Sequence, residues 1–224
     1  THIDLLPFTR RIWKSRLGQC NLGNIEKRVL GIEREQDDIP GYLVPDFYRD
    51  YLFNGNTSMI PGIFYHNEID VLSLSTLFSW LAAILEDPSD ARFTDPGDLV
   101  SVGRVLEILQ REHLAEQIYA SDRLQQSPTP ERQKGLLLLA NLQKRKGNLE
   151  EASALWQEAA SEGSLEAFLE LAKYYEHHNR DYPAALACTI QALTLCSTEL
   201  QAAQLNHRRN RLEKKLSSRN NDSL

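Results

Sequence analysis

The chain has 224 residues, of which 42% are hydrophobic and 25% charged, as in ordinary globular domains. Its net charge of −6 excludes a global basic field that would draw the whole molecule to nucleic acid or anionic lipid, so any such attraction must be local. Three widely spaced cysteines, with no Cys/His pair at zinc-ligand spacing, argue against a structural zinc site and favour a reducing cytoplasm.

The chain begins without a methionine, and its first residues, "THIDLLPFTRR", resemble the middle of a domain. We therefore expect a piece of a longer protein. No apolar run reaches the ~18 residues of a membrane span, so we expect no membrane partner.

Residues 1–88 form the first predicted domain, of mixed character. The run "HIDLL" is rich enough in apolar residues for a strand or the end of one, and helical spacing follows in "FTRRIWKSRL" and "NLGNIEKRVLGI". Gly31 is a predicted C-cap. A short aromatic helix is expected from about Pro45 to Phe53, ended by Asn54-Gly55-Asn56, and a last helix from about Asn67 to Glu86.

Residues 89–98 form a predicted linker, within the stretch "EDPSDARFTDPGD" that holds two prolines, a glycine and several carboxylates. Residues 99–216 form a predicted all-α domain. This domain contains three copies of one pattern. In each copy a small residue is followed by Ala twelve positions later, and a larger side chain comes four positions after that Ala. The copies are Gly103/Ala115/Tyr119, Ala140/Ala152/Trp156 and, more weakly, Ala172/Ala184/Cys188. The pattern resembles the tetratricopeptide repeat, which implies stacked helical hairpins and a possible protein partner. Residues 217–224 are a polar tail.

The stretch "GIFYHNEIDVLSL" carries the candidate chemistry. In a helix, His66 and Asp70 face the same way, while the stripe Ile69, Leu72, Leu77 and Leu81 can pack inward. An acidic group beside an imidazole suits a hard divalent metal with proton transfer nearby. Alternatively, Asn67 and Asp70 serve only the helix N-terminus, and the spacing alone favours this capping interpretation.

Residues 1–88 contain several separated motifs: "HIDLL", "RRIW", "LGI-R", "DIPG", "VP--Y" and "HN--D". In their order and spacing, these motifs resemble the YprB-type ribonuclease H-like exonuclease domain of the DEDD superfamily. The resemblance implies an α/β fragment of that fold, mostly helical in this chain. It also implies a metal-dependent nuclease, in which four carboxylates hold two divalent ions that assist phosphodiester hydrolysis. By this resemblance Asp70 is a ligand of Mg²⁺ or Mn²⁺ and His66 the general base.

Two departures from the family pattern matter. Family members with a histidine base usually have four residues between that base and the Asp, and members with a tyrosine base have three. Here three residues separate His66 from Asp70 and four separate Tyr65 from it, so the role of base is shared between His66 and Tyr65. No Asp-x-Glu of the family's first strand occurs upstream of Asp70. The chain alone is therefore expected to be inactive, and missing strands would leave a sheet edge open for self-association.

A locally basic region, with Arg10, Arg11, Lys14 and Arg16 at its centre, either contacts nucleic-acid phosphates or is a solvated helix face. Trp13 is more typical of core than of base stacking. The pair His177-His178 is read as a loop end, and Asp37-Asp38 as a structural turn.

The sequence thus predicts part of a 3′–5′ exonuclease acting on single-stranded DNA or RNA, with helical repeats attached. The alternative is a non-catalytic helical scaffold with a degenerate nuclease remnant.

Overall fold

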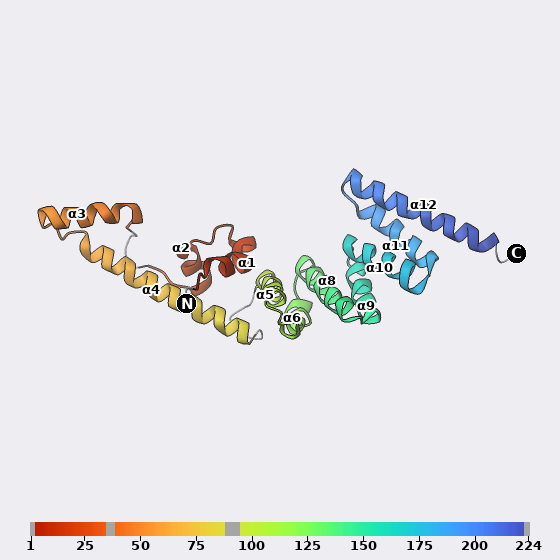
Figure 1. The fold of residues 1–224 in the computed structure, drawn as a ribbon, viewed down its shortest axis with the longest axis horizontal. Helices are drawn as coiled ribbons and strands as arrows, with labels where there is room; N and C mark the ends of the chain where they lie inside the picture. Colours follow the sequence, from red (N-terminus) through yellow and green to blue (C-terminus); the bar gives the residue numbers. More distant parts are fainter. Residues whose placement is uncertain (1–2, 35–38, 88–94, 222–224) are drawn as a thin grey trace. The chain divides into compact units, whose positions relative to one another are not determined.

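The computed structural model describes residues 3–34, 39–87 and 95–221, with side chains described as far as Ser218. Contacts divide the chain into two compact units, Thr1–Arg92 and Phe93–Leu224. The predicted linker falls largely on residues 88–94, which lie outside the described ranges. Every regular element within these ranges is a helix, and none is a strand (Figure 1).

The first unit opens with helix α1 (Leu6–Leu17), then α2 (Leu22–Ile25) and the π-helical turn η1 (Glu26–Leu30). The predicted strand at "HIDLL" is wrong for its described residues, because residues 3–5 form no strand and α1 begins at Leu6. The Asp4 carboxylate accepts a hydrogen bond from the Leu6 N–H just before the helix. The predicted C-cap is confirmed, since Gly31 ends η1 with a φ of 68°, a conformation that favours glycine.

After the 3-10 turn η2 (Gly41–Leu43), helix α3 (Val44–Asn54) begins with Pro45 in its first turn and ends at Gly55, as predicted. Helix α4 (Ile60–Glu86) begins well before the predicted start at Asn67. Pro61 fits the first turn of a helix, and Gly62 lets the backbone approach the buried side chain of Ile39.

The core of this unit forms where α4 contacts α2 and η1. Its buried apolar side chains are Ile12, Trp13, Ile25, Leu77, Leu81 and Ile84. The core reading of Trp13 is therefore confirmed. Leu77 and Leu81 face inward as predicted, but Leu72 is 54% exposed, so the predicted inward stripe is wrong at that position.

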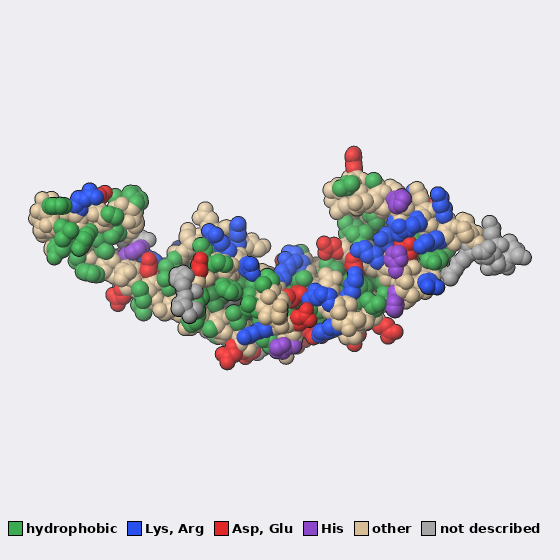
Figure 2. Space-filling view, in the orientation of Figure 1, with side chains coloured by type: hydrophobic (Ala, Val, Ile, Leu, Met, Phe, Trp, Pro, Cys, Tyr) green, Lys and Arg blue, Asp and Glu red, His purple; other side chains and the backbone are tan. Residues whose placement is uncertain are grey.

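The first unit also leaves a broad apolar surface exposed on α3 and α4, which Figure 2 shows gathered over α3. Its most exposed members are Tyr48, Leu52, Phe53, Phe64 and Val71, followed by Leu72. Within the described residues, α4 is also the one helix long and apolar enough to cross a membrane by length and composition, a test that core helices of other proteins pass too.

The second unit is a chain of helices in which each packs mainly on the next in sequence. They are α5 (Pro96–Ile108), α6 (Glu112–Tyr119), α7 (Asp122–Gln125), α8 (Thr129–Lys146), α9 (Leu149–Ser161), α10 (Leu165–Tyr174), the π-helical turn η3 (Tyr175–Asn179), α11 (Tyr182–Leu195) and α12 (Glu199–Asn221). Short connections turn α8 into α9 and α10 into α11, which makes helical hairpins (Figure 1).

Small residues lie where neighbouring helices approach closely. A Cβ atom on Gly103 in α5 would overlap the ring of Tyr119 in α6. Ala140, Ala152 and Trp156 are fully buried together in one cluster between α8, α9 and α10. The first two copies of the sequence pattern therefore mark helix contacts.

The third copy is displaced by one residue. Ala172 is buried, but Ala184 and Cys188 are only half-buried. The fully buried side chains of α11 are instead Ala185, Thr189 and Ala192. The π-helical turn η3 inserts between α10 and α11, so the spacing of the earlier copies does not carry over.

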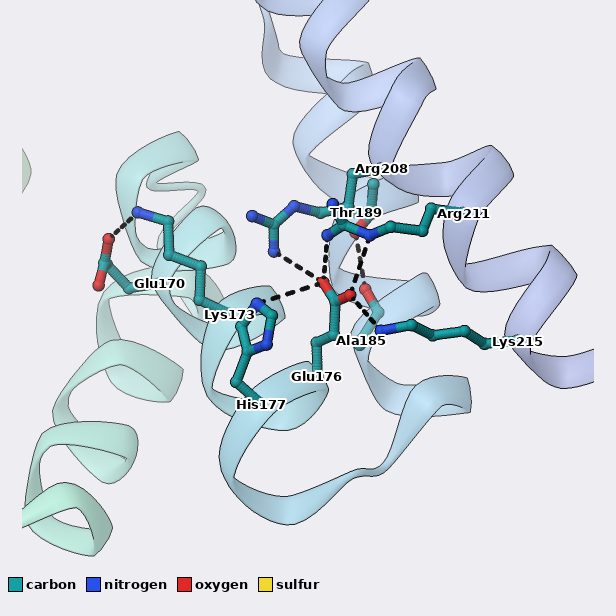
Figure 3. A network of polar contacts seen from close by, with 9 residues as sticks. All are labelled: Glu170, Lys173, Glu176, His177, Ala185, Thr189, Arg208, Arg211 and Lys215. Atoms are coloured by element: carbon teal, nitrogen blue, oxygen red, sulfur yellow. Dashed lines mark hydrogen bonds and ion pairs between the residues drawn. The ribbon is translucent and has the colours of Figure 1, made fainter. Parts of the chain in front are cut away.

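Helix α12 is attached to η3 through one buried carboxylate (Figure 3). Arg211 donates to Glu176 Oε2 at 2.7 Å, and Lys215 Nζ lies 2.9 Å from Oε1. Arg208 Nη1 lies 3.4 Å from Oε2. The Glu176 side chain is 0% exposed, so its charge depends on these three cations.

Candidate active-site cluster on α4

Helix α4 brings His66 and Asp70 onto one face, one turn apart. His66 Nε2 lies 3.3 Å from Asp70 Oδ2. Because α4 begins at Ile60, both residues lie inside the helix, and the alternative that Asn67 and Asp70 serve its N-terminus is wrong. The Asp70 side chain is 32% exposed and points neither into the apolar core nor at its own backbone.

Arg34, in the segment after η1, joins Asp70 to a second carboxylate. Its Nη2 donates to Asp70 Oδ1 and to Glu26 Oε1, both at 2.7 Å. Its Nε donates to Glu26 Oε2 at 2.8 Å, which makes the pair with Glu26 bidentate. The Glu26 side chain is only 2% exposed, so this guanidinium neutralises a charge that water scarcely reaches.

The contacts also fix how His66 is protonated. Arg34 Nη1 lies 3.1 Å from His66 Nδ1, and a guanidinium can only donate. Nδ1 therefore accepts this hydrogen bond, and in the neutral ring Nε2 carries the proton and donates toward Asp70. In this tautomer Arg34 contacts the one ring nitrogen that carries a lone pair.

Tyr65, the other candidate base, lies about 100° around the helix from His66. It is half-buried, and the contact with Asp70 is made by His66.

A hollow of about 440 Å³ opens beside this cluster. It is lined by Gly23, Glu26, Lys27, Ile32, Glu33 and Arg34. Arg34 therefore forms one wall of an open space and is not enclosed on every side.

The cluster does not fit a complete metal centre. The described residues contain no group of three or more His, Cys, Asp and Glu side chains placed to hold one ion. Both oxygens of Asp70 already face partners, Oδ1 toward Arg34 and Oδ2 toward His66. A metal at this point would need donors from elsewhere and the removal of at least one contact.

The basic candidates lie on α1. Arg10, Arg11, Lys14 and Arg16 are exposed, whereas Ile12 and Trp13 between them are buried. The helix therefore has a cationic outer face and an apolar inner one.

The remaining residues singled out in the sequence either make local contacts in η3 or lie outside the described residues. His177 is exposed in η3 against Glu176, and His178 stacks on the ring of Tyr174 at 5.3 Å between centroids. Asp37-Asp38 falls in 35–38, outside the described ranges.

Glu26 and Arg34 were missed as site residues. Arg34 belongs to the "LGI-R" piece of the family resemblance, but nothing in the sequence pairs it with residues 8 and 36 positions away.

Comparison with known proteins relates the first unit to a known superfamily. Residues 1–82 match the family model of the RNase_H superfamily. Over 223 residues the chain is 31% identical to an uncharacterized protein, YprB, of Bacillus subtilis (strain 168), covering 97% of this chain and 53% of that protein. The chain thus spans about half the length of this relative. No solved structure matches the chain. Together the two matches support an RNase H-like, nuclease-like domain at the N-terminus, of which the described part is helical.

Proposed function

We propose that this chain is part of a metal-dependent nuclease, a 3′–5′ exonuclease that hydrolyses single-stranded DNA or RNA in the cytoplasm. The observation that carries the proposal is the contact between His66 and Asp70, one turn apart on α4, within the segment that matches the RNase_H superfamily. Asp70 is the proposed ligand of Mg²⁺ or Mn²⁺, and His66 or Tyr65 the proposed base.

The other ligands of a two-metal site are proposed to come from residues beyond those described. The relative is about twice as long as this chain, so a longer protein of this kind has room for them. The cationic face of α1, with Arg10, Arg11, Lys14 and Arg16, is proposed to hold the phosphates of the substrate, since such contacts are independent of sequence.

The second unit is proposed to be a tetratricopeptide-like array that binds a protein partner. Its hairpins and the close contacts at Gly103 and Ala140 support this role.

The nuclease proposal is tested in a chimera, in which this chain replaces the aligned half of the Bacillus subtilis relative. The chimera is expected to shorten a 5′-labelled single-stranded oligonucleotide from its 3′ end when Mn²⁺ is added. Asp70→Asn should lower the rate about a hundredfold, because it removes a ligand charge at the reacting phosphate.

Asp46→Asn is the matched control, since Asp46 is an exposed carboxylate on α3 with one weak ion pair at 3.4 Å to Arg49. An inactive chimera beside an active relative, or an Asp70→Asn chimera as fast as the control, contradicts the proposal.

The alternative function is a helical scaffold with a degenerate nuclease remnant. The helical hairpins of the second unit favour it. It predicts that the chimera lacks metal-dependent cleavage and that the second unit alone retains any protein partner.

A further inference from the structure

A hollow of about 210 Å³ on the second unit is lined by residues of α8, α9, α10 and η3. Its lining combines cations with aromatic rings and includes Lys144, Trp156, Glu170, Lys173, Tyr174 and His178. The proposed nuclease chemistry uses none of these residues.

The aromatic rings of the hollow form a series. The ring centroid of Tyr174 lies 6.4 Å from that of Trp156 and 5.3 Å from that of His178, which is stacked on it at an angle of 25°. His178 is exposed, so its ring continues the series toward solvent. A nucleobase is a flat ring with a π-face, and it can extend such a stack whatever its identity.

Trp156 adds a buried hydrogen-bond donor to this lining. The residue is 1% exposed, and its Nε1–H has no acceptor in the part of the chain that the structure describes. A buried donor without a partner is unfavourable. The hollow that Trp156 lines therefore suits a ligand that carries acceptor oxygens, as every nucleotide does.

Two groups of cations border the hollow, and each is held in place by one carboxylate. Lys144 and Lys173 both contact Glu170, with Lys144 Nζ 2.7 Å from Glu170 Oε2. The second group surrounds Glu176 (Figure 3) and consists of Arg208, Arg211 and Lys215. Because these contacts fix the cations, little side-chain freedom is lost when they bind an anion.

The two groups lie side by side. His177 lines the hollow, and its Nε2 is 3.7 Å from Glu176 Oε2. The charges of Glu170 and Glu176 both act on Arg208. Five cations thus face two carboxylates, in a protein whose net charge is −6. Figure 2 shows Lys and Arg side chains gathered over α11 and α12. This local surplus of positive charge attracts a polyanion.

We propose that the hollow and the cations beside it bind single-stranded nucleic acid, with a base stacked on His178 and phosphates on the cations. This is a second nucleic-acid contact, beyond the phosphate contacts proposed for α1, and it does not depend on catalysis. An acidic peptide would match the charges but would leave the series of rings unused, so the rings favour nucleic acid.

The test measures binding of a fluorescent thymidylate strand of about twenty nucleotides to the 224-residue protein by fluorescence anisotropy at low salt. EDTA is present, so metal-dependent cleavage cannot interfere. The wild type should bind an abasic strand of equal length and charge about tenfold more weakly, because that strand cannot stack. Lys173→Gln with His178→Ala should weaken binding of the thymidylate strand about tenfold.

Lys134→Gln with His113→Ala is the matched control. It makes the same chemical changes at two exposed positions of the second unit that do not line the hollow, and it should bind as the wild type does. Folding of both variants is checked by circular dichroism. Should the Lys173 and His178 variant not fold, the ring resonances of His178 in the wild type give the answer. They should shift when the thymidylate strand is added, while those of His113 stay in place.

Four results would overturn the proposal. They are no binding of the thymidylate strand by the wild type, a folded Lys173 and His178 variant that binds as tightly as the control, equal affinity for the abasic strand, and unshifted His178 resonances. Displacement of the strand by an equal charge concentration of a glutamate peptide would mark the surface as protein-binding and would also count against it. None of these results decides whether the longer protein is a nuclease, because that proposal is judged by the Asp70→Asn chimera.

Discussion

Replacing Glu176 with Gln should strongly destabilise the second unit. Glu176 is fully buried in η3 and joins α12 through Arg208, Arg211 and Lys215 (Figure 3). Burial raises the pKa of the carboxyl, but the hydrogen bonds from Arg211 and Lys215 outweigh it and lower the pKa from 4.5 to about 2. A shift of that size corresponds to about 3 kcal/mol of folding free energy.

An independent estimate of the free-energy cost of Glu176→Gln has the same magnitude. Removing one partner of a fully buried ion pair costs roughly 3–5 kcal/mol. The cations left here, Arg208, Arg211 and Lys215, are 19%, 42% and 37% exposed, so the lower end of that range applies. For a unit of this size, a loss of about 3 kcal/mol lowers the melting temperature by roughly 10 °C.

The direction in which stability changes with pH follows from the lowered pKa of Glu176. The stabilisation by the Glu176 carboxylate is fully present above the unfolded pKa of 4.5 and is lost as the pH falls toward about 2. Thermal unfolding followed by circular dichroism should show Glu176→Gln melting well below the wild type at pH 7, with a gap that narrows below pH 4.

Glu213→Gln on α12 is the control for this experiment. Glu213 is 53% exposed and pairs with Arg209 at 3.8 Å, so its loss should cost under about 1 kcal/mol. Equal melting temperatures of wild type and Glu176→Gln at pH 7, or a gap that stays constant from pH 7 to pH 3, would refute the reasoning.

Three further predictions concern the 224-residue protein. Gly103→Ala should lower its free energy of unfolding in urea by about 1–3 kcal/mol, because the new Cβ overlaps the Tyr119 ring. Gly23→Ala is the control, since a Cβ there meets open space and should change stability little. Equal effects of the two substitutions would contradict the packing of Gly103 against Tyr119. The protein alone should not degrade single-stranded DNA or RNA with Mg²⁺ or Mn²⁺, and robust cleavage that Asp70→Asn abolishes would disprove this. Light scattering over a concentration series should show self-association through the apolar surface of α3 and α4, which Phe53→Ser with Phe64→Ser weakens; a monomer at all concentrations would argue against it.

Local signals in the sequence predicted local structure well. Gly31 and Gly55 end their helices with positive φ, as expected where glycine alone is unstrained. The copies at Gly103 and Ala140 mark real helix contacts, since a small residue against a large one is a packing requirement. The third copy missed by one residue, because a π-helical turn is not visible in residue spacing.

The predicted start of α4 at about Asn67 is too late, because the helix already begins at Ile60. Proline is suited to a first helical turn, and packing on Ile39 makes the glycine useful there. The contact of His66 with Asp70 follows from helical periodicity and was predictable. Its partners Arg34 and Glu26 were not, because tertiary folding alone brings them to α4.

The most direct measurement of the central claim is the rate at which the chimera with the Bacillus subtilis relative shortens a 5′-labelled single strand in Mn²⁺. The account predicts metal-dependent loss of nucleotides from the 3′ end, slowed about a hundredfold by Asp70→Asn and unchanged by Asp46→Asn. Equal rates for the two variants would contradict it.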